Sequence, residues 1–349
     1  MTGQLAVIGA GAWGTALSIH AARAGYAPRL WVHGPELLAL LLKSRENPWY
    51  LPGVQVPQSV RPTGSLAEAA AGAEVVIVAV PSHVLRRVAT DLVSCLEPGA
   101  RVLSAAKGIE EERFARISEI LTEVLPPRQR DRIAVLSGPT FALEVAEGRP
   151  TAAVVAAADA ALARELQRAL ATRAFRLYTQ TDVAGVELGG ALKNVMAIAA
   201  GIADGLDLGA NARAALLTRG LAEMARLGVA RGAHARTFAG LAGLGDLLLT
   251  CTGQLSRNRR LGLALAGGTS LAEWQAGTRS VAEGVRTTRA ALALGRTVGV
   301  ATPIAAEVGA VLFDGRSPRE ALTSLLSREV RPEEEPGDLI GASGGASPG

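Results

Sequence analysis

The sequence LAVIGAGAWGTAL, residues 5–17, contains the pattern that decides the expected fold. An apolar run over residues 5–8 is followed by Gly9, Gly11 and Gly14 at the spacing G-x-G-x-x-G, and a helix-compatible segment comes directly after. In such loops the first glycine permits a tight turn, the second lets the backbone approach a pyrophosphate, and the third lets the helix pack close to the strand. The first N–H groups of that helix would point at the phosphates. The pattern favours a dinucleotide site, although a βαβ turn without a ligand can share it.

Strand and helix patterns alternate through the first half of the chain, which predicts a doubly wound, parallel α/β sheet of the Rossmann type. Residues 47–57, NPWYLPGVQVP, contain so much proline and glycine that we expect a loop there. The expected strands are 5–8, 29–32, 74–80, 101–106, 132–136, 151–156 and 175–179, and the expected helices are 13–24, 65–72, 82–96 and about 160–171.

Several polar or glycine positions directly follow these strands. Ligands of open α/β sheets bind outside the carboxyl ends of the strands, and parallel strands share that edge. We therefore expect one edge of the sheet to collect Gly9, His33, Pro81, Lys107 and Gly138.

His33 occupies the position where an NAD-binding unit usually has an acidic residue for the ribose 2′-hydroxyl. Without a carboxylate there, a 2′-phosphate is not repelled, so NADP fits at least as well as NAD. Arg29 and Arg45 are candidate helpers and Glu36 a candidate displaced ribose ligand, although the sequence alone favours a solvated surface position for each of them.

From Asp182 onward the strand patterns give way to helical periodicity. We expect an N-terminal dinucleotide-binding domain over residues 1–181 and an all-helical substrate-binding domain over 182–330. Residues 331–349 are acidic and rich in glycine, serine and proline, a composition that cannot supply a core, so we expect a disordered tail.

Composition excludes several classes of protein. The 349 residues carry a net charge of +4 with basic and acidic residues interspersed, and only 3% are aromatic, which argues against a nucleic-acid partner. The four histidines form no ligand cluster, so no metal site is expected. Cys95 and Cys251 are far apart, which suits a reducing cytoplasm. No signal peptide is apparent, and apolar stretches such as 75–80 fall short of the ~20 residues that span a bilayer.

Lys193 lies in GGALKNVMAIAAG, a segment with helical periodicity. Its neighbours on the same helix face would be glycines and alanines, and burial among apolar groups lowers the pKa of an ammonium group. A lysine in such a place can act as a general base near neutral pH. The competing interpretation is a lysine whose ammonium reaches solvent.

Other polar residues in the second half have ordinary structural explanations as well. Asp246 in GLAGLGD could simply cap a helix. Ser256, Arg257 and Asn258 at a helix start could hold a phosphate, or could be a cap followed by solvated side chains. Glu283 fits a capping box that begins at Ser280.

In order along the chain, GAGAWGTAL, NPWYLPGV, AVPSH, AAKGIE, SGPTFALE, GGALKNVMAIAAGI, GLAGLGDLLLTCT, LSRNRRLG and VAEGV resemble the bacterial-type NAD(P)-dependent glycerol-3-phosphate dehydrogenases. The resemblance covers residues 3–330. It implies reversible hydride transfer between sn-glycerol 3-phosphate and dihydroxyacetone phosphate, usually toward glycerol 3-phosphate for phospholipid synthesis.

The resemblance also implies roles for individual residues. Lys193 would be the proton acceptor or donor at the C2 oxygen. The other implied substrate contacts are Lys107, Gly138, Thr140, Asp246, Ser256, Arg257 and Asn258. Besides the three glycines, the implied dinucleotide contacts are Ala12, Trp13, His33, Lys107, Ala142, Arg257, Val281 and Glu283.

Two positions depart from the pattern of the family. His33 stands where an arginine is often found, and Ala12 stands where a serine is frequent, so the choice between NAD and NADP stays open. A reductase of a related two-domain family acting on another keto acid, and a catalytically silent dinucleotide sensor, are the alternatives. The sequence leaves open feedback regulation, the role of the tail and the oligomeric state, for which a homodimer is one candidate.

Overall fold

The computed structural model describes residues 3–278, 282–329 and 333. The chain divides into two compact units, one of residues up to Val183 and one of Ala184–Thr278 with the described residues from Ala282 onward. Apart from residue 333, the tail predicted to be disordered lies outside the described residues.

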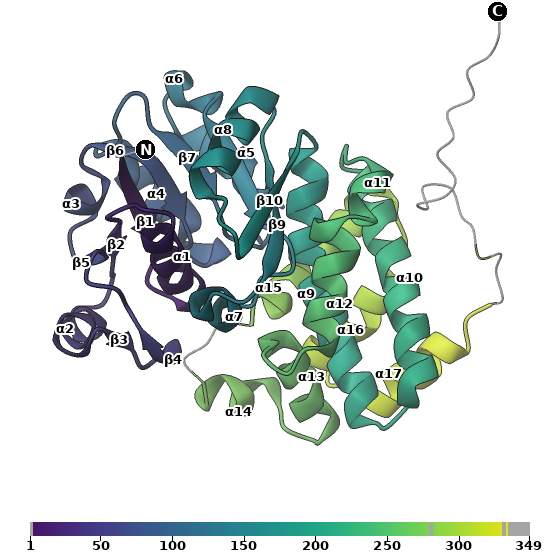
Figure 1. The fold of residues 1–349 in the computed structure, drawn as a ribbon. Coiled ribbons are helices and arrows are strands. Elements are labelled where there is room, and N and C mark those ends of the chain that lie inside the picture. The colour runs from purple at the N-terminus through teal and green to yellow at the C-terminus, as the bar shows by residue number, and fades with distance from the viewer. Residues whose placement is uncertain (1–2, 279–281, 330–332, 334–349) are drawn as a thin grey trace, which may run out of the picture. The chain divides into compact units, whose positions relative to one another are not determined.

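The first unit is built on an eight-stranded sheet with the order β10-β9-β8-β7-β6-β1-β2-β5 (Figure 1). All seven expected strands are present, and β5 is an additional edge strand that the sequence patterns did not indicate. The strands are β1 (Gln4–Ile8), β2 (Arg29–Trp31), β5 (Arg61–Thr63), β6 (Ala73–Val78), β7 (Arg101–Ser104), β8 (Ile133–Ser137), β9 (Thr151–Ala156) and β10 (Phe175–Gln180).

The prediction of a parallel sheet is right for every neighbouring pair except one. β8 and β9 run antiparallel, with Val135 opposite Ala156. The segment between them holds only the short helix α7 (Ala142–Glu147), and β9 starts at the edge where β8 ends. The sheet is therefore mixed.

Helices cover both faces of this sheet, as its alternating side chains require. Leu5 and Val7 of β1 belong to one core cluster, which includes residues of α1, α7 and α8. Ala6 and Ile8 point the other way into a second cluster with α4 and α5. The helices of this unit, besides α7, are α1 (Ala12–Arg23), α2 (Pro35–Ser44), α3 (Leu66–Ala70), α4 (Ser82–Val93), α5 (Ile117–Val124), α6 (Pro127–Arg130) and α8 (Ala160–Leu170).

The prediction of a loop over residues 47–57 is wrong. β3 (Glu46–Asn47) and β4 (Leu51–Gln55) form a separate antiparallel ribbon. Pro52 and Gly53 are tolerated because a two-stranded ribbon leaves one edge of each strand without a ladder partner. The backbone N–H of Val56 donates to the carbonyl of Arg45 (2.7 Å), which closes the ribbon at its base.

In the second unit, every regular element that the structure describes is a helix. These elements are α9 (Val183–Gly205), α10 (Gly209–Val229), α11 (Ala235–Phe238), the π-helix η1 (Leu241–Gly245), α12 (Asp246–Thr252), α13 (Arg257–Ala266), α14 (Leu271–Ala276), α15 (Glu283–Val298), α16 (Pro303–Phe313) and α17 (Pro318–Leu326).

α9 is the central helix of this unit. It is long and apolar enough to cross a membrane, but 94% of its most apolar window is buried in the protein, as in a core helix. α13 approaches it so closely that a Cβ at Gly201 would overlap the carbonyl oxygen of Arg259, and a Cβ at Gly262 would overlap that of Ile198. This approach places α13 against the C-terminal third of α9.

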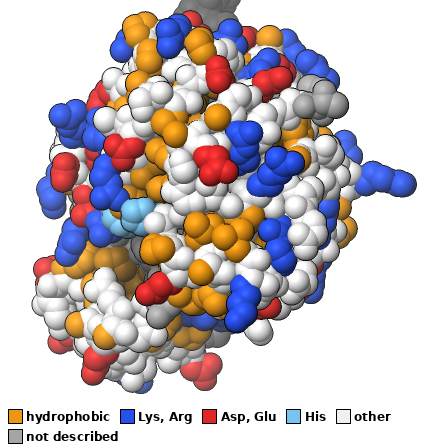
Figure 2. All heavy atoms as spheres, turned by 90° about the vertical axis from the view of Figure 1, so that its left-hand side faces the viewer, with side chains coloured by type: hydrophobic (Ala, Val, Ile, Leu, Met, Phe, Trp, Pro, Cys, Tyr) orange, Lys and Arg blue, Asp and Glu red, His pale blue; other side chains and the backbone are white. Residues whose placement is uncertain are grey.

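Basic and acidic side chains are interspersed on the face drawn in Figure 2, with hydrophobic side chains between them. This agrees with the mixed charge pattern of the sequence.

Candidate functional site

The glycine-rich loop has the geometry that its spacing predicts. Gly9 directly follows β1 with a φ of +113°, a conformation that residues with a side chain rarely adopt. A Cβ at Gly14 would overlap the carbonyl oxygen of Gly9, so the third glycine is needed for the close approach of α1. Gly11 differs, because a Cβ there would meet no atom within 4 Å. The packing of the protein therefore does not explain Gly11, whereas a ligand lying against the loop would.

The start of α1 fits the phosphates of a dinucleotide. Its first turn contains Ala12 and Trp13 and has no acidic residue, which leaves the positive end of the helix available to an anion. The indole N–H of Trp13 is buried and has no hydrogen-bond partner in the described part of the chain. An orphaned donor and an open glycine at one helix start are both compatible with a bound dinucleotide.

Lys107, Gly138 and Thr140 lie together after two neighbouring strands, β7 and β8. The Lys107 ammonium donates to the carbonyl oxygen of Gly138 (2.9 Å) and to the hydroxyl oxygen of Thr140 (3.3 Å). Gly138 has a φ of +131°, and Ala142 begins the helix that follows. The unit thus gathers a cation, a hydroxyl group and a helix start at the carboxyl edge of the sheet.

His33 follows β2 and is exposed, with its ring 5.5 Å from that of Trp31. The two candidate helpers for a 2′-phosphate have other partners. Arg29 donates to the carbonyl oxygens of Glu68 and Ala71 at the end of α3, and Arg45 donates to carbonyl oxygens of residues 56, 57 and 60. Both arginines therefore have structural roles, and their role as helpers stays a prediction, as does that of the exposed His33 and Glu36 near this strand end.

In the second unit, Lys193 lies in the middle of α9 and is only 6% exposed. Its ammonium forms an ion pair with the carboxylate of Asp246, which is 1% exposed, and donates to the hydroxyl oxygen of Thr250 (2.9 Å). The interpretation of a lysine reaching solvent is wrong. The expected surroundings of Lys193 were glycine and alanine only, so the carboxylate of Asp246 was not expected beside it.

Asp246 is the first residue of α12 and directly follows the π-helix η1. The helix-cap interpretation fails, since Gly245 is the N-cap and the Asp246 side chain turns to Lys193. Thr250 lies one turn later on the same helix and was missed. Its spacing of four residues from Asp246 was a usable signal, because such residues share a helix face.

Asn258 joins three helices of the second unit. Its amide group donates to the side-chain oxygen of Asn194 on α9 (2.9 Å), and its own oxygen accepts from the N–H of Gly284 on α15 (3.0 Å). Ser256 caps α13 by accepting from the N–H of Arg259, as expected, while the Arg257 side chain is exposed. Asn194, next to Lys193 in the sequence, was not among the predicted residues.

The capping box predicted for Glu283 is wrong. α15 begins at Glu283 with Ala282 as its N-cap, so Glu283 is the first helical residue instead of the third. Val281, which the resemblance implies as a dinucleotide contact, lies outside the described residues. No cluster of three or more His, Cys, Asp or Glu suited to a metal ion occurs among the described residues.

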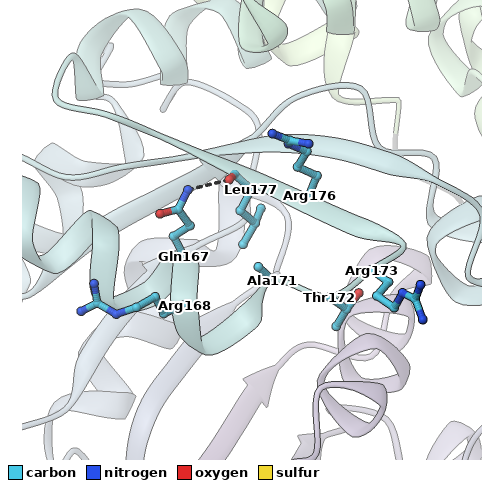
Figure 3. Close-up of a pocket in the computed structure, with 7 residues that line it drawn as sticks. All are labelled: Gln167, Arg168, Ala171, Thr172, Arg173, Arg176 and Leu177. Atoms are coloured by element: carbon cyan, nitrogen blue, oxygen red, sulfur yellow. Dashed lines mark hydrogen bonds between the residues drawn. The ribbon is translucent and has the colours of Figure 1, made fainter.

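A separate hollow between the end of α8 and the start of β10 contains none of the predicted residues. Figure 3 shows that its three arginines, Arg168, Arg173 and Arg176, point in different directions, and all three are exposed. The Gln167 amide donates to the backbone of Leu177 (2.7 Å) instead of facing the hollow. Diverging surface arginines are not a built site for an anion.

These features define a class of protein. A glycine-rich loop on a Rossmann-type sheet is typical of enzymes that bind a nicotinamide dinucleotide, and the helical unit adds a buried lysine–aspartate pair suited to proton transfer.

Comparison with known proteins identifies the family. A model described as NAD-dependent glycerol-3-phosphate dehydrogenase N-terminus matches residues 4–163, and one described as NAD-dependent glycerol-3-phosphate dehydrogenase C-terminus matches residues 182–323. The chain belongs to the NAD-dependent glycerol-3-phosphate dehydrogenase family.

Individual relatives agree along nearly the full chain. Glycerol-3-phosphate dehydrogenase [NAD(P)+] from Citrifermentans bemidjiense is 50% identical over 95% of this chain and 99% of its own. The enzyme of the same name from Koribacter versatilis is 51% identical over 93% of this chain and 97% of its own. The crystal structure of glycerol-3-phosphate dehydrogenase from Coxiella burnetii, 37% identical, superimposes with a TM-score of 0.89 and covers 94% of this chain and 99% of that one.

Proposed function

We propose that this protein catalyses reversible hydride transfer between NAD(P)H and dihydroxyacetone phosphate, giving sn-glycerol 3-phosphate, as the names of its relatives indicate. The observation that carries the proposal is the buried Lys193–Asp246 pair in a chain of this family. We assign dinucleotide binding to residues 1–181 and substrate binding to residues 182–330.

In this proposal Lys193 moves the proton. When bound at the glycine-rich loop, NAD(P)H would supply the hydride for C2 of dihydroxyacetone phosphate, and the C2 oxygen would need a proton to become a hydroxyl group. The Lys193 ammonium gives that proton, and in the reverse direction the amine accepts it. Asp246 holds the ammonium in place and favours its charged form, while Thr250 fixes its direction by accepting a hydrogen bond.

The remaining predicted residues bind the two anionic ligands. Arg257 and the start of α13 with Ser256 and Asn258 offer charge-assisted donors to the substrate phosphate. Lys107, with Gly138 and Thr140, is assigned to both the substrate and the dinucleotide. The dinucleotide contacts are Gly9, Gly11, Ala12, Trp13, Gly14, His33, Ala142, Arg257, Val281 and Glu283. Synthesis of glycerol 3-phosphate for phospholipids, a cytoplasmic location and a homodimer stay predictions from the sequence.

The test of this function is the variant Lys193→Ala. We expect turnover to be lost, by about 100-fold or more, because the proton donor is gone. Binding of NADPH, followed by its fluorescence, should change little. Since the substitution leaves Asp246 buried and unpaired, the fold must be checked by circular dichroism, and Lys193→Ala with Asp246→Asn removes the stranded charge. Full activity in a folded Lys193→Ala protein would rule out the assignment.

One absorbance assay separates the alternatives. Oxidation of NADH or NADPH at about 340 nm, a property of the reduced nicotinamide, is measured with dihydroxyacetone phosphate and with unphosphorylated keto acids. We expect turnover with dihydroxyacetone phosphate only. A preference for a keto acid would favour a related reductase, and no turnover with any substrate would favour a dinucleotide sensor. Comparing the two cofactors in the same assay gives their order of preference.

A further inference from the structure

Asn47 is a buried residue that the proposed function does not use. It lies in β3, its side chain is fully buried, and its amide group makes three hydrogen bonds that use both N–H donors and the oxygen. The amide nitrogen donates to the carbonyl oxygen of Ala10 (2.9 Å) and to the hydroxyl oxygen of Thr15 (2.8 Å). The amide oxygen accepts from the N–H of Tyr50 (3.1 Å). Asn47 therefore ties the β3–β4 ribbon to the glycine-rich loop.

The contact with Ala10 fixes one peptide group of that loop. In a trans peptide the C=O and the following N–H point in opposite directions. Because the Ala10 carbonyl is held toward Asn47, the N–H of Gly11 is held away from it. Gly11 is the position where a Cβ would stand in open space, so this N–H belongs to the part of the loop that a ligand can approach.

The loop needs an external contact of this kind. Ala10 is flanked by Gly9 and Gly11, and glycine tolerates backbone conformations that other residues avoid. Rotation of the peptide between Ala10 and Gly11 therefore meets little steric resistance from the loop itself. A rotated peptide would present a carbonyl oxygen, in place of an N–H, to an anionic pyrophosphate.

The ribbon that carries Asn47 is itself well held. Arg45, at the base of the ribbon, donates to the carbonyl oxygens of Val56 (3.3 Å) and Val60 (2.8 Å). The N–H of Gly53 donates to the carboxylate of Glu46 (2.7 Å) and ties the middle of β4 to β3. The amide of Asn47 is thus presented from a rigid support.

We propose that Asn47 is a positioning residue for the dinucleotide, holding the Ala10–Gly11 peptide in the orientation that receives the pyrophosphate. This inference rests on the proposed function only in that a dinucleotide binds the glycine-rich loop. It adds the β3–β4 ribbon to the part of the protein that determines cofactor affinity.

The decisive variant is Asn47→Ser. A serine hydroxyl can still accept a hydrogen bond from the N–H of Tyr50, as in local serine turns, but is too short to reach Ala10. The matched control is Thr15→Val, which removes the other partner of the same amide nitrogen and leaves the contact with Ala10. The readouts are the Kd of NADPH by fluorescence, the thermal midpoint, and kcat at saturating NADPH.

We expect Asn47→Ser to raise the Kd of NADPH about tenfold with kcat changed less than about twofold, since a correctly bound complex reacts as before. Thr15→Val should lower the thermal midpoint while changing the Kd less than about twofold. A folded Asn47→Ser protein with an unchanged Kd, or equal weakening in both variants, would overturn the inference.

Two further results are informative. If Asn47→Ser does not fold, Asn47→Ala is measured in the same way, because it also removes the donor to the Ala10 carbonyl and adds no charge. A folded Asn47→Ala protein with the Kd of the parent would also count against the inference. If the unsubstituted protein failed to bind NADPH, the proposed function would be wrong, whereas binding that is indifferent to Asn47 would refute only this inference.

Discussion

Lys193 and Asp246 are 53 positions apart in the sequence and form a buried ion pair. The helical periodicity around Lys193 predicts its helix and the small residues beside it, but no local pattern reveals a partner on another helix. The same limit applies to Asn258 and Asn194, which are 64 positions apart. Residue types and spacing can nominate candidates, whereas the contacts that set their charge and direction depend on the packing of helices.

The carboxylate of Asp246 should affect the rate, because it holds the ammonium of Lys193 in place. In Asp246→Asn the ammonium loses its ionic partner, and we expect kcat/KM to fall about tenfold or more. Thr250→Val is the control, because it removes only a neutral hydrogen-bond partner of the same ammonium and should lower kcat/KM less. A folded Asp246→Asn protein with the kcat/KM of the parent would contradict this role.

At the scale of elements, local patterns predict seven of the eight strands of the main sheet but only four of the eight helices described in this unit, since α2, α5, α6 and α7 were not predicted. Two of the strands that were not predicted depend on partners elsewhere. β5 has three residues and is a strand through its pairing with β2, and β3 has two residues and pairs only with β4. β9 is antiparallel to β8 because the chain enters β9 at the same edge of the sheet where β8 ends. The composition of the segment does not indicate this direction.

Glu223 of α10 holds the start of α16. Its carboxylate accepts from the N–H groups of Ile304 (2.8 Å) and Ala305 (3.0 Å), the second and third residues of that helix. Burial raises the pKa of Glu223 to about 7, although these two hydrogen bonds, and the charges of Arg226 and Arg328, act in the opposite direction.

This raised pKa predicts a pH-dependent stability. Between the ordinary glutamate pKa and about 7, the folded protein binds a proton that the unfolded chain has released, so stability falls as pH rises through this window. Glu223→Gln should not show this fall in stability, because a glutamine side chain does not titrate. Urea unfolding measures the free energy of unfolding at pH 5 and at pH 8. From the lower to the higher pH, this free energy should fall by up to about 3 kcal/mol more in the parent than in the variant.

Glu273→Gln is the control for that experiment. Hydrogen bonds from Ser270 lower the pKa of Glu273, so this carboxylate is ionised throughout the interval from pH 5 to pH 8. Its replacement should leave the pH dependence of the parent intact. If Glu223→Gln kept that dependence as well, another group would be responsible for it.

At the scale of the whole molecule, the alternation of strands and helices followed by helices alone predicts the fold class, and the order of the motifs predicts the family. The sheet edge could be predicted because parallel strands align their carboxyl ends, which brings Lys107 to Gly138. The helical unit has no comparable rule. The association of α9, α12, α13 and α15 around Lys193 and Asn258 follows from close packing at glycines, which a single sequence does not reveal.

The distribution of charge over the whole molecule leads to the last prediction. The net charge is +4, and basic and acidic residues are interspersed along the sequence and on the face drawn in Figure 2. Long-range attraction of anions should therefore be weak, and affinity should come from local contacts such as Arg257 and the start of α1. We expect kcat/KM for dihydroxyacetone phosphate to fall less than about tenfold between roughly 20 and 300 mM salt.

The same distribution should make binding to duplex DNA negligible at physiological salt, measured by filter retention. A protein that neutralises 6–10 phosphates loses about 10³–10⁵ in affinity over a comparable range of salt, and it does so through aligned basic side chains. A salt dependence of that steepness, with retention of DNA at low salt, would mean that the basic residues act together as one surface. A shallow dependence on salt, with no retention of DNA, would mean that each anionic ligand is attracted by the side chains that contact it and not by the basic residues of the whole surface.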